Sequence, residues 1–64
     1  MDTVATIDFR EASTGDRGAI IVRSAPGVLG LALTLEDDGD IEALLPADAC
    51  RRVIHALERA LQPS

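Results

Sequence analysis

The chain has 64 residues, of which 47% are hydrophobic and 27% are charged, and its formal net charge is −5. This length predicts a single domain over residues 1–64, and the apolar fraction is too high for a disordered chain of this charge. The acidic balance disfavours nucleic acid and anionic membranes as partners. With one cysteine, Cys50, and one histidine, His55, we expect no intrachain disulfide, no metal site and no cofactor. Self-association remains as a route to stability for so small a domain.

The first part of the chain predicts two strands joined by a loop. Residues 3–10 alternate apolar and polar side chains, which is the period-two pattern typical of a strand. Residues 11–18 are polar with two glycines and predict a flexible hairpin loop, and residues 19–24 predict the second strand. Pro26 and Gly27 then occupy the positions that these residues favour in a type II turn.

The most regular pattern lies over residues 28–36, where four leucines alternate with other side chains. Period two places those leucines on one face of a third strand. Asp38 and Gly39 both tolerate positive φ and predict a tight hairpin, which leads into a fourth strand over residues 41–45. Sequential strands joined by short turns usually pair with their neighbours, so we predict a four-stranded antiparallel meander.

The last segment predicts an amphipathic helix from near Pro46 to about Leu61. Proline suits the first turn of a helix, and the charge of Asp48 complements the helix dipole there. The apolar residues follow the spacing of one buried stripe: Cys50, Val53, Ile54, Leu57 and Leu61. The predicted fold class is α+β, a four-stranded antiparallel meander sheet (ββββα) with one C-terminal amphipathic helix packed on one face.

This helix is expected to seal the leucine-bearing face of the sheet from water. The side chains expected beneath it are Ile7, Phe9, Ile20, Val22, Leu29, Leu31, Leu33, Ile41 and Leu45. One helix covers one face only, so apolar residues on the other face are expected to form a small exposed patch.

That patch, together with the arginines on the outward side of the helix, is the candidate interaction surface. Gly30 beside it lets another backbone approach closely, and the arginines on an acidic protein favour self-association. The surface consists of Ile21, Val28, Ala32, Leu44, Arg51, Arg52 and Arg59. The alternative is that these are ordinary isolated surface residues and solvated helix charges.

The acidic run over residues 36–42 is the densest charge cluster of the chain. Its aspartates are adjacent and a strand follows at once, so the run does not meet the EF-hand pattern of alternating ligands. A solvated hairpin tip is the simplest interpretation. A weakly bound cation or an arginine-rich partner is the alternative.

No catalytic constellation is visible in the sequence. Cys50 and His55 lie about 500° apart around the helix and so point in different directions. We therefore predict no catalytic residues and expect that the chain is not an enzyme. The alternative is an enzyme whose site is assembled between subunits, where Cys50 and His55 of two chains meet.

A leucine-rich strand, a hairpin and a Leu-Pro-Ala-Asp helix start at residues 45–48 follow each other in this chain. In outline this is similar to the transcriptional coactivator family whose dimers bind single-stranded DNA, and the resemblance covers most of the chain. It implies a dimer that holds bases with basic residues and aromatic stacking platforms. The chain has no lysine, and Phe9, its only aromatic residue, is expected to face the core.

The residues together predict a non-enzymatic protein-interaction module that acts as a homodimer, with a further protein partner as a possibility. A single-stranded nucleic-acid-binding dimer is the alternative, although nucleic acid is the less expected partner. The first residues lack the basic start and apolar run of a signal peptide, and no segment reaches the roughly 20 apolar residues of a membrane span. We expect a cytoplasmic protein with no membrane partner.

Overall fold

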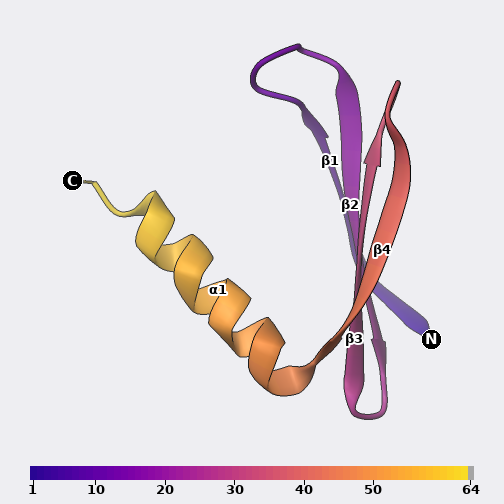
Figure 1. The fold of residues 1–64 in the computed structure, drawn as a ribbon, viewed down its shortest axis with the longest axis vertical. Coiled ribbons are helices and arrows are strands. Elements are labelled where there is room, and N and C mark those ends of the chain that lie inside the picture. The colour runs from indigo at the N-terminus through magenta and orange to yellow at the C-terminus, as the bar shows by residue number, and fades with distance from the viewer. Residues whose placement is uncertain (64) are drawn as a thin grey trace.

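The computed structural model describes residues 1–63 and contains one antiparallel sheet followed by one helix (Figure 1). The elements are β1 (Asp2–Arg10), β2 (Arg17–Ala25), β3 (Val28–Leu35), β4 (Gly39–Pro46) and α1 (Ala47–Leu61). Each strand pairs with its neighbour in the sequence, in the order β1-β2-β3-β4. The predicted ββββα class is confirmed.

The register of the strands decides which residues share a face. Ile7 pairs with Ile20, Ile20 with Leu33, and Leu33 with Ile41, so one apolar row crosses all four strands. We call the side of the sheet that carries this row the inner face, and the opposite side, which carries Arg23, the outer face. Both faces contain the residues expected from the alternation of the sequence.

Each turn at the ends of the sheet has a glycine with a positive φ within it or directly after it. Gly27 has a φ of 77°, as position i+2 of the predicted type II turn requires. The expected tight turn with positive φ at both Asp38 and Gly39 is wrong, because only Gly39 has a positive φ. Three residues separate the paired Leu35 and Gly39, and the Asp38 N–H donates to the Leu35 carbonyl at 3.2 Å. This is a three-residue hairpin loop, and the glycine with positive φ is the first residue after it.

The connection between β1 and β2 is a hydrogen-bonded turn, and it is shorter than the predicted loop over residues 11–18. The carboxylate of Glu11 accepts hydrogen bonds from the backbone N–H and hydroxyl groups of Ser13 and Thr14, at 2.6–3.0 Å. The backbone N–H of Glu11 also donates to the carbonyl of Asp16 at 2.8 Å, which closes the loop. Strand β2 therefore begins at Arg17, two residues before the predicted start.

Helix α1 begins directly after β4, without a connecting loop. Pro46 is the last residue of β4 and the N-cap of α1, with an extended ψ of 156°. Asp48 lies in the first turn and Arg59 in the last, where their charges complement the helix dipole. Within residues 1–63, no helix is long and apolar enough to cross a membrane.

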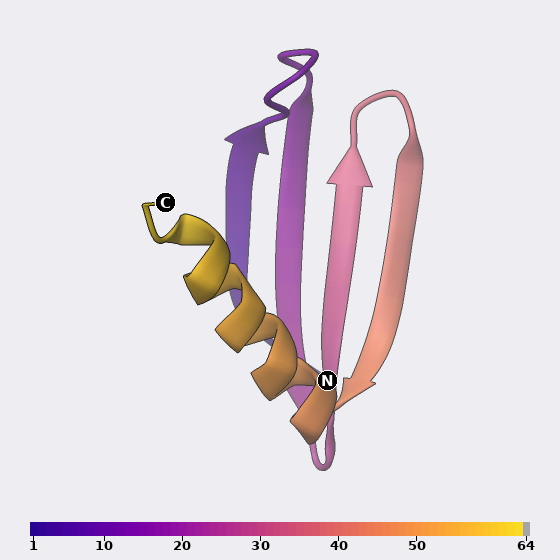
Figure 2. The ribbon, with the colours of Figure 1, turned by 60° about the vertical axis from the view of Figure 1, so that its left-hand side comes forward.

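The helix lies on the inner-face side of the sheet but diverges from it (Figures 1 and 2). In the described chain, α1 comes close to β3 and β4 only. The exposed fraction rises along the stripe, from 38% at Val53 and 52% at Ile54 to 60% at Leu57 and 85% at Leu61. The C-terminal end of α1 therefore lies free of the sheet to which its N-terminal end is joined.

The expectation that the helix seals the inner face is consequently wrong. Leu31 and Leu33 are each 37% exposed, and Ile7 and Ile41 are more exposed still. In the described chain, Ala32 is the only buried apolar side chain, and it belongs to the outer face. The physical reason is the junction: a helix that follows an extended strand without intervening residues has no turn to bring it back across the sheet.

Candidate functional site

The main unpartnered surface of the molecule consists of the inner face of the sheet and the side of α1 that is turned toward it. We call these two facing surfaces, and the angle between them, the apolar wedge. Cys50 is half-buried at its narrow end, where α1 leaves the sheet. Because the stripe continues from Cys50 along one side of α1, its other members also face the wedge. The exposed apolar side chains on the two arms are Ile7, Leu31, Leu33 and Ile41 on the sheet and Val53, Ile54, Leu57 and Leu61 on the helix.

The apolar side of α1 is wider than one sheet contact requires. At about 100° per residue, the stripe spans roughly 100°, which is the width expected for a helix that faces one core. Three alanines extend it on one flank, so that apolar residues occupy roughly half of the helix circumference. These alanines are Ala49, Ala56 and Ala60. A helix with this pattern can contact two apolar surfaces at once.

The area of the chain indicates how much surface lacks a partner. The accessible surface is 5121 Å², whereas a folded monomer of this size is expected to expose about 3,900 Å². The radius of gyration is 13.0 Å, against about 10.7 Å for a compact domain of this length. The excess of about 1,200 Å² per chain corresponds to about 2,400 Å² for a pair, which falls within the range of permanent homodimers.

The predicted patch on the outer face is assembled but largely covered. The register brings Ile21 next to Ala32 and places Leu44 beside Gly30 on the same face. Ala32 is buried, Ile21 and Val28 are half-buried, and only Leu44 is well exposed.

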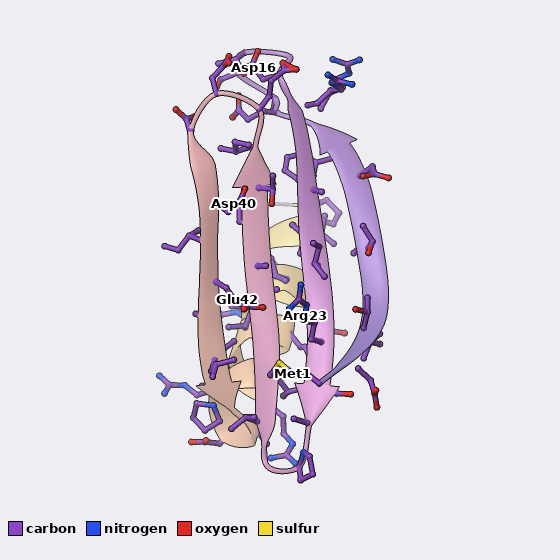
Figure 3. The ribbon with its side chains drawn as sticks, turned by 90° about the vertical axis from the view of Figure 1, so that its right-hand side faces the viewer. Met1, Asp16, Arg23, Asp40 and Glu42 are labelled. Atoms are coloured by element: carbon purple, nitrogen blue, oxygen red, sulfur yellow. The ribbon has the colours of Figure 1, made fainter. Side chains whose placement is uncertain are left out.

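Side chains of the same chain fill the space above Gly30. The guanidinium Nη1 of Arg23 lies 3.7 Å from the Glu42 carboxylate, and this ion pair crosses β3 on the outer face (Figure 3). If residue 30 had a side chain, its Cβ atom would lie 3.3 Å from the Glu42 carboxylate oxygen and 3.4 Å from the terminal methyl group of Met1. Within one chain, the room that Gly30 provides is therefore lined by the side chains of Glu42 and Met1.

The helix arginines of the candidate interaction surface lie apart from this patch. Arg51, Arg52 and Arg59 are exposed on the side of α1 that points away from the wedge, where they line a shallow hollow with His55 and Ala56. Within residues 1–63 they form no ion pair, whereas Arg17 and Arg23 of the sheet each lie beside a carboxylate. The predicted surface is thus divided into two separate parts.

Three carboxylates meet at the end of the sheet where the β1–β2 loop lies beside the β3–β4 turn. Oxygen atoms of Asp16, Glu36 and Asp37 lie within 4.8 Å of one another. Arg17 flanks them, with its Nε 3.2 Å from the Glu36 carboxylate. Sequence reasoning included the last two acids in the run 36–42 but missed Asp16, because only strand pairing brings the β1–β2 loop beside the β3–β4 turn. Glu36 and Asp37 are exposed and Asp16 is half-buried, and exposed acidic clusters of this kind are common without a bound ion.

The reactive side chains and the aromatic ring do not converge. Cys50 faces the wedge, whereas His55 lies on the opposite, outward side of α1. Phe9 is half-buried on the inner face, where it pairs with Gly18. A Cβ built on Gly18 lies only 2.6 Å from the end of the Phe9 ring, so the ring occupies the space that the glycine leaves open.

Comparisons with protein-family models, with curated proteins and with solved structures found no match to this chain. The candidate site is therefore defined by its own geometry: an open wedge with apolar residues on both arms.

Proposed function

We propose that this chain is a non-enzymatic protein-interaction module whose functional unit is a homodimer. The observation that carries the proposal is the apolar wedge, whose sheet arm and helix arm are both exposed within one chain. Contiguous apolar surface of this kind is unfavourable in water and marks an interaction site. A second copy that covers the wedge stabilises both chains.

A second copy fits the wedge better than an unrelated partner for two reasons. The excess surface is of the size that permanent homodimers bury. In addition, each copy carries the same wedge, so a single two-fold contact covers both wedges at once.

The surfaces that stay outside the wedge are those available to a further protein. They comprise Leu44 on the outer face and the outward arginines Arg51, Arg52 and Arg59. The proposal places the protein in the cytoplasm, where the reducing environment keeps the thiol of Cys50 free.

The test is the mass of the protein in solution, measured by light scattering behind a sizing column. We expect the unmodified chain to elute with twice the chain mass. Leu57→Asp places a charge in the wedge and is expected to abolish the dimer. Circular dichroism then shows whether the resulting single chain is folded or unfolded, and either state agrees with the proposal. His55→Asp is the matched control, because it introduces the same charge on the outward side of α1.

A further variant separates the two possible dimer surfaces. Leu44→Asp places the same charge on the outer face and is expected to leave the dimer intact. If Leu44→Asp dissociates the dimer and Leu57→Asp does not, the outer face is the dimer surface and the wedge proposal is wrong. A monomeric unmodified chain at high concentration contradicts the homodimer itself.

A further inference from the structure

We infer that the two copies bind by reciprocal insertion, with the helix of each chain lying in the apolar wedge of the other. This inference rests on the proposed homodimer and specifies its geometry. The two helices then run antiparallel between two sheets, and the C-terminal end of each helix contacts the inner face of the partner's sheet.

The gradient of exposure along α1 is the first support. Val53, near the junction, keeps part of its surface covered by its own chain, whereas Leu61 is 85% exposed. The part of the stripe that most needs a partner is therefore the part farthest from its own sheet. The largest apolar area available to cover it is the inner face of another copy, where Ile7 is 52% and Ile41 is 69% exposed.

The width of the apolar side of α1 is the second support. In the inserted position a helix contacts the partner's sheet and the partner's helix together, and this requires apolar residues over more than one narrow stripe. The stripe and its alanine flank provide such an arc. The small side chains of Ala49, Ala56 and Ala60 let a second helix approach closely.

Two-fold symmetry is the third support. In an isologous dimer, if residue i of one chain contacts residue j of the other, then j also contacts i. A helix that enters the partner's wedge therefore brings the partner's helix into its own wedge. One contact type fills both wedges and leaves the polar arc of each helix, with Arg51 and Arg52, at the solvent side.

Disulfide trapping between two differently marked chains tests this arrangement. All chains carry Cys50→Ser, so that each has one cysteine at a chosen place. One chain carries Leu61→Cys at the end of the helix, and the second carries either Leu33→Cys or Ile7→Cys on the inner face. The matched control chain carries Thr34→Cys on the outer face of the same strand as Leu33. The marked chains are mixed, allowed to exchange and oxidised mildly.

Reciprocal insertion predicts a disulfide-linked dimer from the helix-marked and inner-face-marked chains. The linked product should exceed that of the Thr34→Cys control by about tenfold or more, because a disulfide forms only when the two Cα atoms come within about 7 Å. This distance requirement makes the outer-face cysteine an appropriate comparison.

Two results overturn the inference in different ways. If one chain that carries both Leu61→Cys and Leu33→Cys links internally and stays a monomer, the helix closes on its own sheet. If the unmodified chain is a dimer by light scattering but neither inner-face cysteine links to the helix, the homodimer stands and reciprocal insertion is wrong. A monomeric unmodified chain overturns the proposed function instead.

Discussion

At the scale of single residues, Gly18 has the clearest structural role. It lies in β2 opposite Phe9, and a Cβ at this position meets the Phe9 ring at 2.6–3.0 Å and Leu35 at 3.0 Å. Real Cβ atoms do not approach so closely, so the ring must move if Gly18 is replaced. Gly18 was predicted to lie in a loop, because a glycine next to polar residues gives the same sequence pattern in a loop as at the start of a strand.

We predict that Gly18→Ala destabilises the protein by about 1–3 kcal/mol through this clash. The measurement is chemical denaturation, carried out also in a Phe9→Leu background that removes the ring. In that background the cost of Gly18→Ala should largely disappear, because residues in direct contact show strong coupling in a double-mutant cycle. Equal costs in the two backgrounds contradict the contact.

The Glu11 turn gives a pH-dependent prediction. The hydrogen bond from the Ser13 hydroxyl, followed by those from Thr14, lowers the pKa of Glu11 below its ordinary value of 4.5. Because the folded pKa is depressed, the stabilisation is present above the unfolded pKa and is lost as the pH falls through the folded pKa. The turn should therefore loosen only in acid, below about pH 4.5.

The comparison variant is Glu11→Gln, which cannot ionise. Its deficit in stability should be largest at neutral pH and should shrink as the pH falls toward about 3, as measured by denaturation at a series of pH values. The amide resonances of Ser13 and Thr14 report on the same transition. A deficit that stays constant over this range contradicts the assignment.

At the scale of elements, the sheet was predictable from local signals and the direction of the helix was not. Alternation over β3 and the turn at Pro26 and Gly27 fixed the pairing of neighbouring strands, since both are features of adjacent residues. The ends of β2 were missed because Arg17 and Gly18 have no strand-like pattern. The apolar stripe of α1 was predictable from its spacing. A stripe does not specify which surface covers it, and within this chain most of it is exposed.

Helix α1 is expected to depend on the second copy for its order. An isolated helix of about 15 residues is only marginally stable in water, and little of α1 packs on its own chain. We predict that the amide hydrogens from Val53 to Leu61 exchange with solvent much faster in the Leu57→Asp variant than in the unmodified dimer. The measurement is hydrogen exchange followed by mass spectrometry or NMR.

The paired amides of β2 and β3 provide the internal reference for this experiment. These central strands are hydrogen-bonded on both sides, so their protection should decrease less than that of α1 if the monomer keeps its sheet. Slow exchange of α1 in a confirmed monomer contradicts the view that the partner orders the helix.

At the scale of the whole molecule, stability should depend on protein concentration. Since each chain lacks a core of its own, unfolding and dissociation are expected to occur together. We predict that the midpoint of thermal unfolding falls on dilution, with a loss of about 1.4 kcal/mol of dimer stability for each tenfold decrease in concentration. The measurement is a dilution series followed by circular dichroism. A midpoint that does not change with concentration indicates a self-sufficient monomer.

The candidate site was only partly predictable at this scale. The apolar residues of both arms were correctly identified as members of two amphipathic elements, because periodicity reports on each element by itself. Their assignment to a sealed core failed at Pro46, where the absence of a connecting loop sets the helix direction. The outer-face patch has little exposed area, because Ala32 is buried and Ile21 and Val28 are half-buried. The extent of such burial depends on neighbouring strands, which periodicity within one element does not report.

The near absence of buried side chains within one chain has a consequence for the life of the protein in a cell. If the proposed homodimer is correct, a newly made chain that has not met a second copy keeps its helix and the leucine side of its sheet open to proteases and chaperones, and such segments are the first to be cleaved. Its steady-state abundance would then follow its rate of synthesis more steeply than in simple proportion, because the chance that two copies meet grows with the square of their number.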